Sequence, residues 1–212
     1  RKSAGGDAPV VGVLLYRKHV ITRQPYIQQL IEQMEEEGLV PLPYFINGVE
    51  AHTVVRDLFT SRRQMAEGRV ALKPGAAEVD AVVSTVGFPL VGGPAGTMEG
   101  SRQAEVAKEI LGSMGVPYLV AAPLLIQDLA SWSREGIQGL QSVVLYSLPE
   151  LDGAIDTVPI GGLVGDDIYL IRERVTRLCG RLKRWVRLQK QPKAERRMGI
   201  MLYGFPPGVG AT

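Results

Sequence analysis

The sequence has one cysteine, two histidines and few aromatic residues. Cys179 has no partner for a disulfide within the chain and cannot by itself build a thiolate metal cluster, which fits a reducing compartment. We expect it to be a structural thiol packed in a helix. Aromatic residues make up only 6% of the chain, and they are not interleaved with cations as base-stacking surfaces require, so we expect no nucleic-acid partner.

Long apolar runs are also missing. The longest, residues 116–126, is interrupted by Pro117 and Pro123 and falls short of the roughly 20 residues that span a membrane. We therefore expect no transmembrane segment. Residues 1–9 are small and polar, and we interpret them as a flexible N-terminal stretch without the apolar core of a signal peptide.

The charge of the chain is unevenly distributed. Residues 172–197 carry eleven Lys or Arg and two Glu, a net charge of +9, whereas the remaining residues carry thirteen basic and twenty acidic side chains, a net charge of −7. Such a charge run is typical of a solvated helix face. Docking onto an acidic partner or sister domain is the functional alternative.

Short β-rich runs alternate with helical patterns, which predicts an α/β fold with a Rossmann-like or flavodoxin-like parallel sheet flanked by helices. We expect strands at residues 10–16, 39–46, 81–86, 117–121 and 142–148. We expect helices at residues 24–37, 53–66, 101–114 and 168–190, with a short one within 125–132. The buried stripe expected for the last long helix is Ile171, Val175, Leu178, Leu182 and Trp185. The domain would cover residues 10–165, followed by a basic helix and linker at 166–197.

An internal similarity suggests a second module. Residues 11–16 read VGVLLY and residues 198–203 read MGIMLY, and both follow a polar stretch. We interpret residues 198–212 as the first strand of a following α/β module, and the chain as a piece of a longer protein. Two strands that merely share a residue pattern would look the same.

Ligands of open parallel sheets bind beyond the carboxyl ends of the strands. Arg17 and His19 follow the first expected strand, Gly92 and Gly93 lie in the loop after the third, and the PELDG segment follows the fifth. We therefore expect cations, a glycine loop and carboxylates at one edge of the sheet. Each also has a plainer interpretation, as a solvated histidine, a tight loop and a strand-exit turn.

The PELDG segment shows why the choice matters. Turn chemistry accounts for Asp152 as a cap and for Gly153 at positive φ. It does not account for Glu150, because Glu is not a favoured turn residue. A carboxylate held beside a rigid proline turn could instead accept protons or bind a hard cation.

Five motifs occur in one order between residues 10 and 207: VGVLLYRKHVIT, VGGPAG, VPYLVAAPL, LPELDGAI and KAERRMGIMLYGFPP. Together they resemble the large porphyrin-binding H subunit of magnesium chelatase, which is related to the large subunit of cobaltochelatase. The resemblance covers only a small, central part of the H subunit. The resemblance implies insertion of Mg²⁺, as a substrate ion, into protoporphyrin IX for chlorophyll synthesis. It further implies an ATPase partner that uses ATP, an adaptor subunit, and no cofactor bound to this segment. Plastid stroma or bacterial cytoplasm, with or without peripheral membrane association, would be the location.

The resemblance also assigns roles to residues. Glu150 would be a catalytic base and metal ligand, with Asp152 second, because Mg²⁺ prefers oxygen ligands. Arg17 and the backbone at Gly92 and Gly93 would bind the substrate, and His19 would bind propionate or relay protons. Glu195, within KAERR, is a further acidic contributor. Residues 22–26 depart from the family pattern, so a non-catalytic ligand-binding or subunit-docking module is the alternative.

Overall fold

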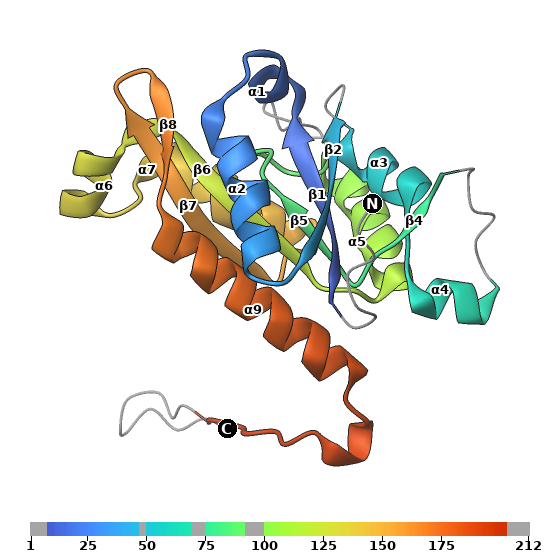
Figure 1. Ribbon diagram of the computed structural model, residues 1–212. Helices are drawn as coiled ribbons and strands as arrows, with labels where there is room; N and C mark the ends of the chain where they lie inside the picture. Colours follow the sequence, from blue (N-terminus) through green and yellow to red (C-terminus); the bar gives the residue numbers. More distant parts are fainter. Residues whose placement is uncertain (1–7, 47–49, 69–74, 92–99, 203–212) are drawn as a thin grey trace.

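The computed structural model describes residues 8–46, 50–68, 75–91 and 100–202 (Figure 1). They form a six-stranded sheet in the order β2-β1-β5-β6-β7-β8. The strands are β1 (Val10–Tyr16), β2 (Val40–Ile46), β5 (Ala81–Ser84), β6 (Tyr118–Asp128), β7 (Asp156–Val164) and β8 (Asp167–Leu170). The first five are parallel and β8 is antiparallel to β7. Counted along the chain, the parallel strands follow the flavodoxin-like order 2-1-3-4-5, which confirms the predicted fold class.

Helices cover both faces of the sheet. One face carries α2 (Pro25–Glu36) and α9 (Arg172–Lys190), whose apolar residues share one core with β1 and β7. The opposite face carries α3 (Ala51–Leu58) and α5 (Gly100–Met114), which share the second core with the crossover between β6 and β7. Figure 1 shows α2 and α9 in front of the sheet and α5 behind it. Because helices cover both faces of the sheet, β1 is buried along nearly its whole length.

The remaining elements are short. They are α1 (Arg17–Ile21), β3 (Phe59–Thr60), α4 (Arg62–Glu67), β4 (Ala77–Glu78), α6 (Leu129–Glu135), α7 (Gly139–Ser142), the π-helical η2 (Val143–Ser147), α8 (Leu148–Leu151) and the 3₁₀ helix η3 (Lys193–Glu195). The helix expected at 53–66 is thus two helices, because Ser61 opens α4 with a capping box to Gln64. The short helix expected within 125–132 begins only at Leu129, since β6 continues to Asp128.

The prediction of a strand at residues 142–148 is wrong. These residues are helical in α7, η2 and α8, and they form the crossover that joins the parallel strands β6 and β7. The fifth strand is β7, which lies later in the chain and contains Pro159, Gly161 and Gly162. Glycine is required at 161, since a Cβ there would lie 2.1 Å from the Tyr169 carbonyl oxygen of β8.

The expected helix at 168–190 begins at Arg172, because residues 167–170 form β8. Val175, Leu178 and Leu182 are buried as predicted, and Cys179 is a buried free thiol. Trp185 is not part of this stripe, since its exposed fraction is 37% and Val186 is buried in its place. Beyond η3 the chain is extended, and the side chains of Met198, Ile200, Met201 and Leu202 are 78–95% exposed.

Candidate functional site

The carboxyl ends of β1 and β5 meet where the strand order reverses. The chain leaves β1 into α1 and leaves β5 through Thr85, and the two exits are joined because the Thr85 hydroxyl donates to the Leu14 carbonyl at 2.9 Å. Ligands of open α/β sheets bind at such a reversal point. Arg17 and His19 both belong to α1, so the structure places these two predicted residues beside it.

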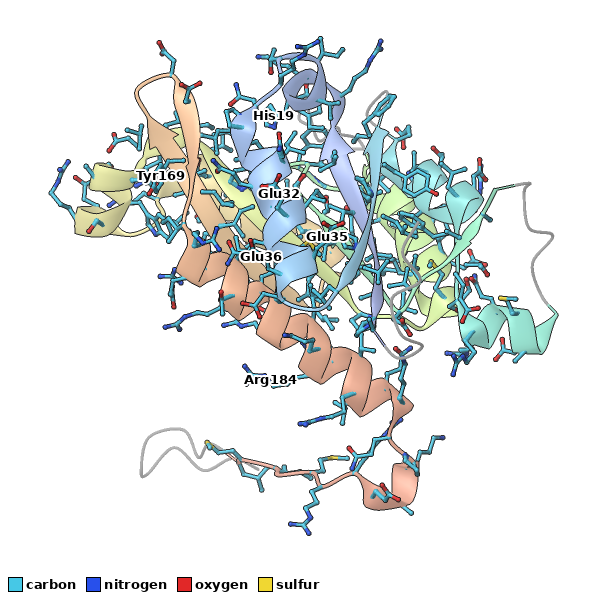
Figure 2. The ribbon with its side chains drawn as sticks, in the orientation of Figure 1. His19, Glu32, Glu35, Glu36, Tyr169 and Arg184 are labelled. Atoms are coloured by element: carbon cyan, nitrogen blue, oxygen red, sulfur yellow. The ribbon has the colours of Figure 1, made fainter. Side chains whose placement is uncertain are left out.

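His19 lies just beneath the surface, with an exposed fraction of 8%. Its Nδ1 is 2.7 Å from the hydroxyl of Tyr26, the second residue of α2. Tyr16 and Tyr26 both meet the imidazole edge-on, at centroid distances of 5.3 and 5.6 Å. Figure 2 shows His19 at the end of α2 nearest α1. The ring is therefore fixed by two aromatic neighbours and one hydrogen bond.

The surroundings of His19 keep its imidazole neutral. Burial lowers the pKa of His19 below its ordinary value, and the positive charge of Lys18 lowers it further. Burial raises the pKa of Tyr26 well above its usual range, partly offset by a hydrogen bond with the Thr85 side chain. A neutral imidazole held in one orientation has the form that a proton acceptor needs, and the burial that keeps it neutral also makes it a weaker base than a free histidine.

Asp152 is a buried carboxylate with an exposed fraction of 3%. The amide of Leu90 donates to its Oδ2 at 2.6 Å, across 62 residues of sequence. The Leu90 carbonyl in turn accepts from the His52 amide at 3.2 Å. Asp152 therefore fixes the segment that follows β5 and leads towards the glycine loop, rather than capping its own turn as expected. Gly153 has the predicted positive φ, at 104°.

Burial raises the pKa of Asp152 to about 6. The amides of Leu90 and Val91 and the charges of His52 and Lys108 act in the opposite direction but are outweighed. A carboxyl group with this pKa exchanges its proton near neutral pH, which is a property shared by many catalytic carboxyl groups and by some purely structural ones.

The two acidic residues predicted alongside Asp152, Glu150 and Glu195, are exposed rather than buried. Glu150 is exposed on α8, and the chain then enters β7 beside Tyr118, the first residue of β6. It thus lies towards the amino ends of the strands, whereas His19 follows a carboxyl end. Glu195 is exposed in η3, beyond the end of α9. The expectation that the carboxylates follow a strand at the same edge as Arg17 and His19 is therefore wrong.

Gly92 and Gly93 lie outside the described residues. In the described ranges, no three His, Cys, Asp or Glu side chains gather closely enough to hold a metal ion. None of the helices in these ranges is both long and apolar enough to cross a bilayer.

Sequence reasoning missed the aromatic and hydroxyl partners of the site. Tyr26 sits in an ordinary helical pattern, and nothing in the sequence marks it as the partner of His19. Phe88, which packs edge-on against Tyr16 at 5.3 Å, and Thr85 are likewise silent in the sequence. For Thr85 and Phe88, the sequence offers one clue to a role in the site, which is that both come shortly after the strand β5.

The strand order and the helices on both faces define an α/β domain with a flavodoxin-like parallel sheet, and the buried imidazole and the anchored segment after β5 lie beside its reversal point. The sequence model of the CobN/Magnesium Chelatase family matches residues 1–212. The chain belongs to this family.

Comparison with individual proteins agrees with this assignment. The chain is 36% identical over 200 residues to the magnesium-chelatase H subunit of Chlorobaculum parvum, and 32% identical over 212 residues to the chloroplastic magnesium-chelatase protein ChlH of rice, Oryza sativa. These alignments cover 94% and 96% of this chain but 14% of each relative. The catalytic subunit of cobaltochelatase from Mycobacterium tuberculosis has a similar structure, with a TM-score of 0.66 and 26% identity over 93% of this chain and 16% of that one.

Proposed function

We propose that this chain is a central part of the porphyrin-binding subunit of a magnesium chelatase. In that role it would contribute one wall of the site at which Mg²⁺, a substrate ion, enters protoporphyrin IX. The family membership over the whole chain supports the proposal. The observation that carries it is the neutral, buried His19 paired with Tyr26 at the point where the strand order reverses.

The chemistry requires a proton acceptor and an oxygen ligand. Two pyrrole N–H protons must leave the porphyrin, and Mg²⁺ loses its water reluctantly. We assign proton transfer to His19, because its imidazole is neutral and held in one orientation. Glu150, on α8 towards the amino ends of the strands, would act apart from His19, either guiding the ion or serving as a separate base. Asp152 would hold the segment around Leu90. Arg17 would pair with a propionate, and Glu195 would add negative charge.

The partners and the location belong to the same proposal. ATP would be hydrolysed by an ATPase subunit and coupled through an adaptor subunit. The compartment would be the plastid stroma or the bacterial cytoplasm, with peripheral membrane association as an option. A non-catalytic domain that docks subunits is the competing function, and the basic side chains along α9 favour it.

The test uses the full-length parent subunit with Glu150→Gln. Protoporphyrin IX binding is measured by fluorescence quenching, and Mg²⁺ insertion is measured with the partner subunits and ATP. We expect unchanged binding and an insertion rate lowered about 100-fold, the typical contribution of an acid–base group. The control is Glu32→Gln, the same change on the exposed face of α2 (Figure 2), which should leave both unchanged. Unchanged insertion in Glu150→Gln would leave this residue without a catalytic role, as a surface residue of α8.

The same assay with His19→Gln tests the residue at the carboxyl ends of the strands. Glutamine keeps a hydrogen-bonding side chain but cannot accept a proton, so insertion should fall while porphyrin binding persists. If only binding falls, His19 holds the propionate instead.

A further inference from the structure

The outer edge of β7 is only partly paired. The ladder to β8 covers Gly161 to Val164, and β6 pairs along the other side of the strand. Residues 156–160 therefore face β6 on one side and lack a described strand on the other. An open strand edge is a template for pairing with a further strand.

Backbone groups along this stretch alternate between its two sides. The Ile155 amide donates inwards to Tyr118 of β6, whereas the Ile160 carbonyl accepts outwards from the Ile171 amide. By this alternation, the N–H and C=O groups of Asp156 and Val158 point outwards. Pro159 faces inwards, where its missing N–H coincides with the register shift against β6. The proline therefore does not block the outer edge.

A cleft of about 480 Å³ lies along this edge, with Thr157, Val158 and Pro159 at its base. One wall is formed by Arg174, Arg177 and Arg181 of α9, which belongs to the core on one face of the sheet. The other wall contains Trp132, Ile137 and Tyr146, which pack against the core on the opposite face. The cleft is thus a slot between the two layers, with arginines on one side and apolar side chains on the other.

The slot is one part of a longer groove along α9, which consists of three neighbouring clefts. Arg181 also lines a neighbouring cleft of about 300 Å³, and Trp185 and Leu188 connect that cleft to a third of about 460 Å³. Within the described residues, the three clefts are lined by six cations and one carboxylate, namely Lys108, Arg174, Arg177, Arg181, Arg184, Arg196 and Asp156. Figure 2 shows Arg184 projecting from α9 away from α2. The groove has exposed apolar area as well, since Ile155, Trp185 and Leu188 are 37–49% exposed.

Some of this positive charge is already paired. Arg181 bonds Asp156 at 2.6 Å, Arg177 bonds Glu173, and Arg174 lies over the Trp132 ring at 5.4 Å. Glu173 is exposed, whereas Asp156 and Trp132 are partly buried. The exposed ion pair of Arg177 with Glu173 can be exchanged for another at a small energetic cost. The contact between Arg174 and Trp132 joins the two walls. We take it as the end of the slot nearest Gly161, where the pairing with β8 begins.

We propose that the open edge of β7 binds an acidic, extended polypeptide segment as an added strand. Because successive side chains of a strand point to opposite faces, the segment would alternate carboxylates towards the arginines of α9 with apolar residues towards Trp132 and Tyr146. About five residues fit beside residues 156–160, at about 3.3 Å per residue. Backbone pairing would supply affinity, and the two walls would supply specificity.

The segment comes from another part of the parent polypeptide. This inference rests on the proposed function only in taking the chain as part of a longer chelatase subunit, because the matched relatives have about seven times its aligned length. A tethered segment acts at millimolar effective concentration, so a short strand suffices. The acidic balance of the chain outside residues 172–197 fits a parent in which acidic surface meets this basic groove.

Hydrogen exchange in the full-length parent tests the proposal. The amides of Asp156 and Val158 should exchange at least tenfold more slowly than unpaired amides in the parent alone. Arg177→Gln combined with Arg181→Gln should remove that protection, and so should 1 M salt, which screens the ion pairs. Arg187→Gln is the matched control, since Arg187 is exposed on α9 and lines none of the three clefts. Unchanged protection of β1 reports that each variant is folded.

A photo-crosslink identifies the occupant. With p-benzoylphenylalanine in place of Ile155, we expect a crosslink to an acidic segment of the same polypeptide. Protection that arises only after the ATPase or adaptor subunit is added, with a crosslink to that subunit, would overturn the assignment to the parent. Rapid exchange with and without partners would overturn docking altogether. Neither outcome depends on the insertion assay, so the proposed function can fail or succeed separately.

Discussion

At the scale of single residues, Asp152 shows how burial can turn an ordinary turn residue into a pH-sensitive anchor. Its carboxyl is enclosed, yet it accepts the Leu90 amide from a distant loop. Desolvation outweighs those hydrogen bonds and raises its pKa to about 6 from 3.8. The folded state therefore holds this proton more tightly than the unfolded state does.

The stabilisation from this proton should be fully present below pH 3.8 and lost as the pH rises through about 6. A shift of about two pKa units corresponds to about 3 kcal/mol. We expect the difference in unfolding free energy between the chain and its Asp152→Asn variant to fall by up to this amount between pH 4 and 7. Urea unfolding at several pH values measures it. A pH-independent difference would mean that Asp152 titrates normally.

The titration of His19 changes the unfolding free energy with pH in the opposite direction. Since its folded pKa is lowered, its stabilisation is present above pH 6.5 and is lost as the pH falls through its folded value. Comparison with Asp152→Asn at each pH cancels this effect, because both proteins keep His19.

Tyr26→Phe removes the hydroxyl that contacts His19 Nδ1. The imidazole would stay buried without its partner, which typically costs about 1–3 kcal/mol. We expect a loss of unfolding free energy in that range, measured by urea unfolding at pH 7. Tyr169→Phe deletes the same atom from a side chain on β8 that is 60% exposed (Figure 2) and should change stability by less than about 0.5 kcal/mol. Equal effects in both variants would argue against the His19–Tyr26 pair.

At the scale of elements, the β7–β8 hairpin depends on close backbone approach. Gly161→Ala would place a Cβ 2.1 Å from a backbone oxygen that cannot rotate away. We expect it to destabilise the chain by about 3 kcal/mol or more, as substitutions that force backbone movement do. Thermal unfolding measures the loss. Gly199→Ala, where a Cβ meets nothing within 4 Å, should leave the midpoint unchanged, and a mild effect at 161 would mean that β8 shifts freely.

The same hairpin explains why the groove of α9 stays open. β8 is short and covers only the carboxyl half of β7, and the chain then turns through Ile171 into α9. This leaves the amino half of β7 between an arginine-lined helix and an aromatic crossover.

At the scale of the whole molecule, the exposed segment after η3 is the feature that the domain does not explain. Met198 and Met201 are 86% and 95% exposed in an extended stretch. If residues 198–212 begin a second module, as the similarity to β1 suggests, both should be buried in the parent subunit. We expect peroxide to oxidise them quickly in the 212-residue chain and at least tenfold more slowly in the parent, as followed by mass spectrometry. Met65, 52% exposed on α4, serves as the reference, and equally rapid oxidation in the parent would contradict the second module.

Local pattern determined much of this protein. The buried run of β1, the amphipathic α2 and the apolar stripe of α9 follow from side-chain periodicity, which is a property of neighbouring residues. The position of Arg17 and His19 after the carboxyl end of the first strand followed as well, whereas the strand order that makes this place the reversal point came from the structure. The family resemblance rested on motifs that are readable in one dimension.

Tertiary structure decided the rest. Residues 142–148 are an apolar run too short for periodicity to separate strand from helix, and only the need for a crossover between β6 and β7 makes them helical. Asp152 finds Leu90, His19 finds Tyr26 and Gly161 meets Tyr169 through contacts that no local pattern encodes. The open edge of β7 likewise exists only because β8 ends early and α9 crosses beside it, so the site and the groove are products of packing between distant segments.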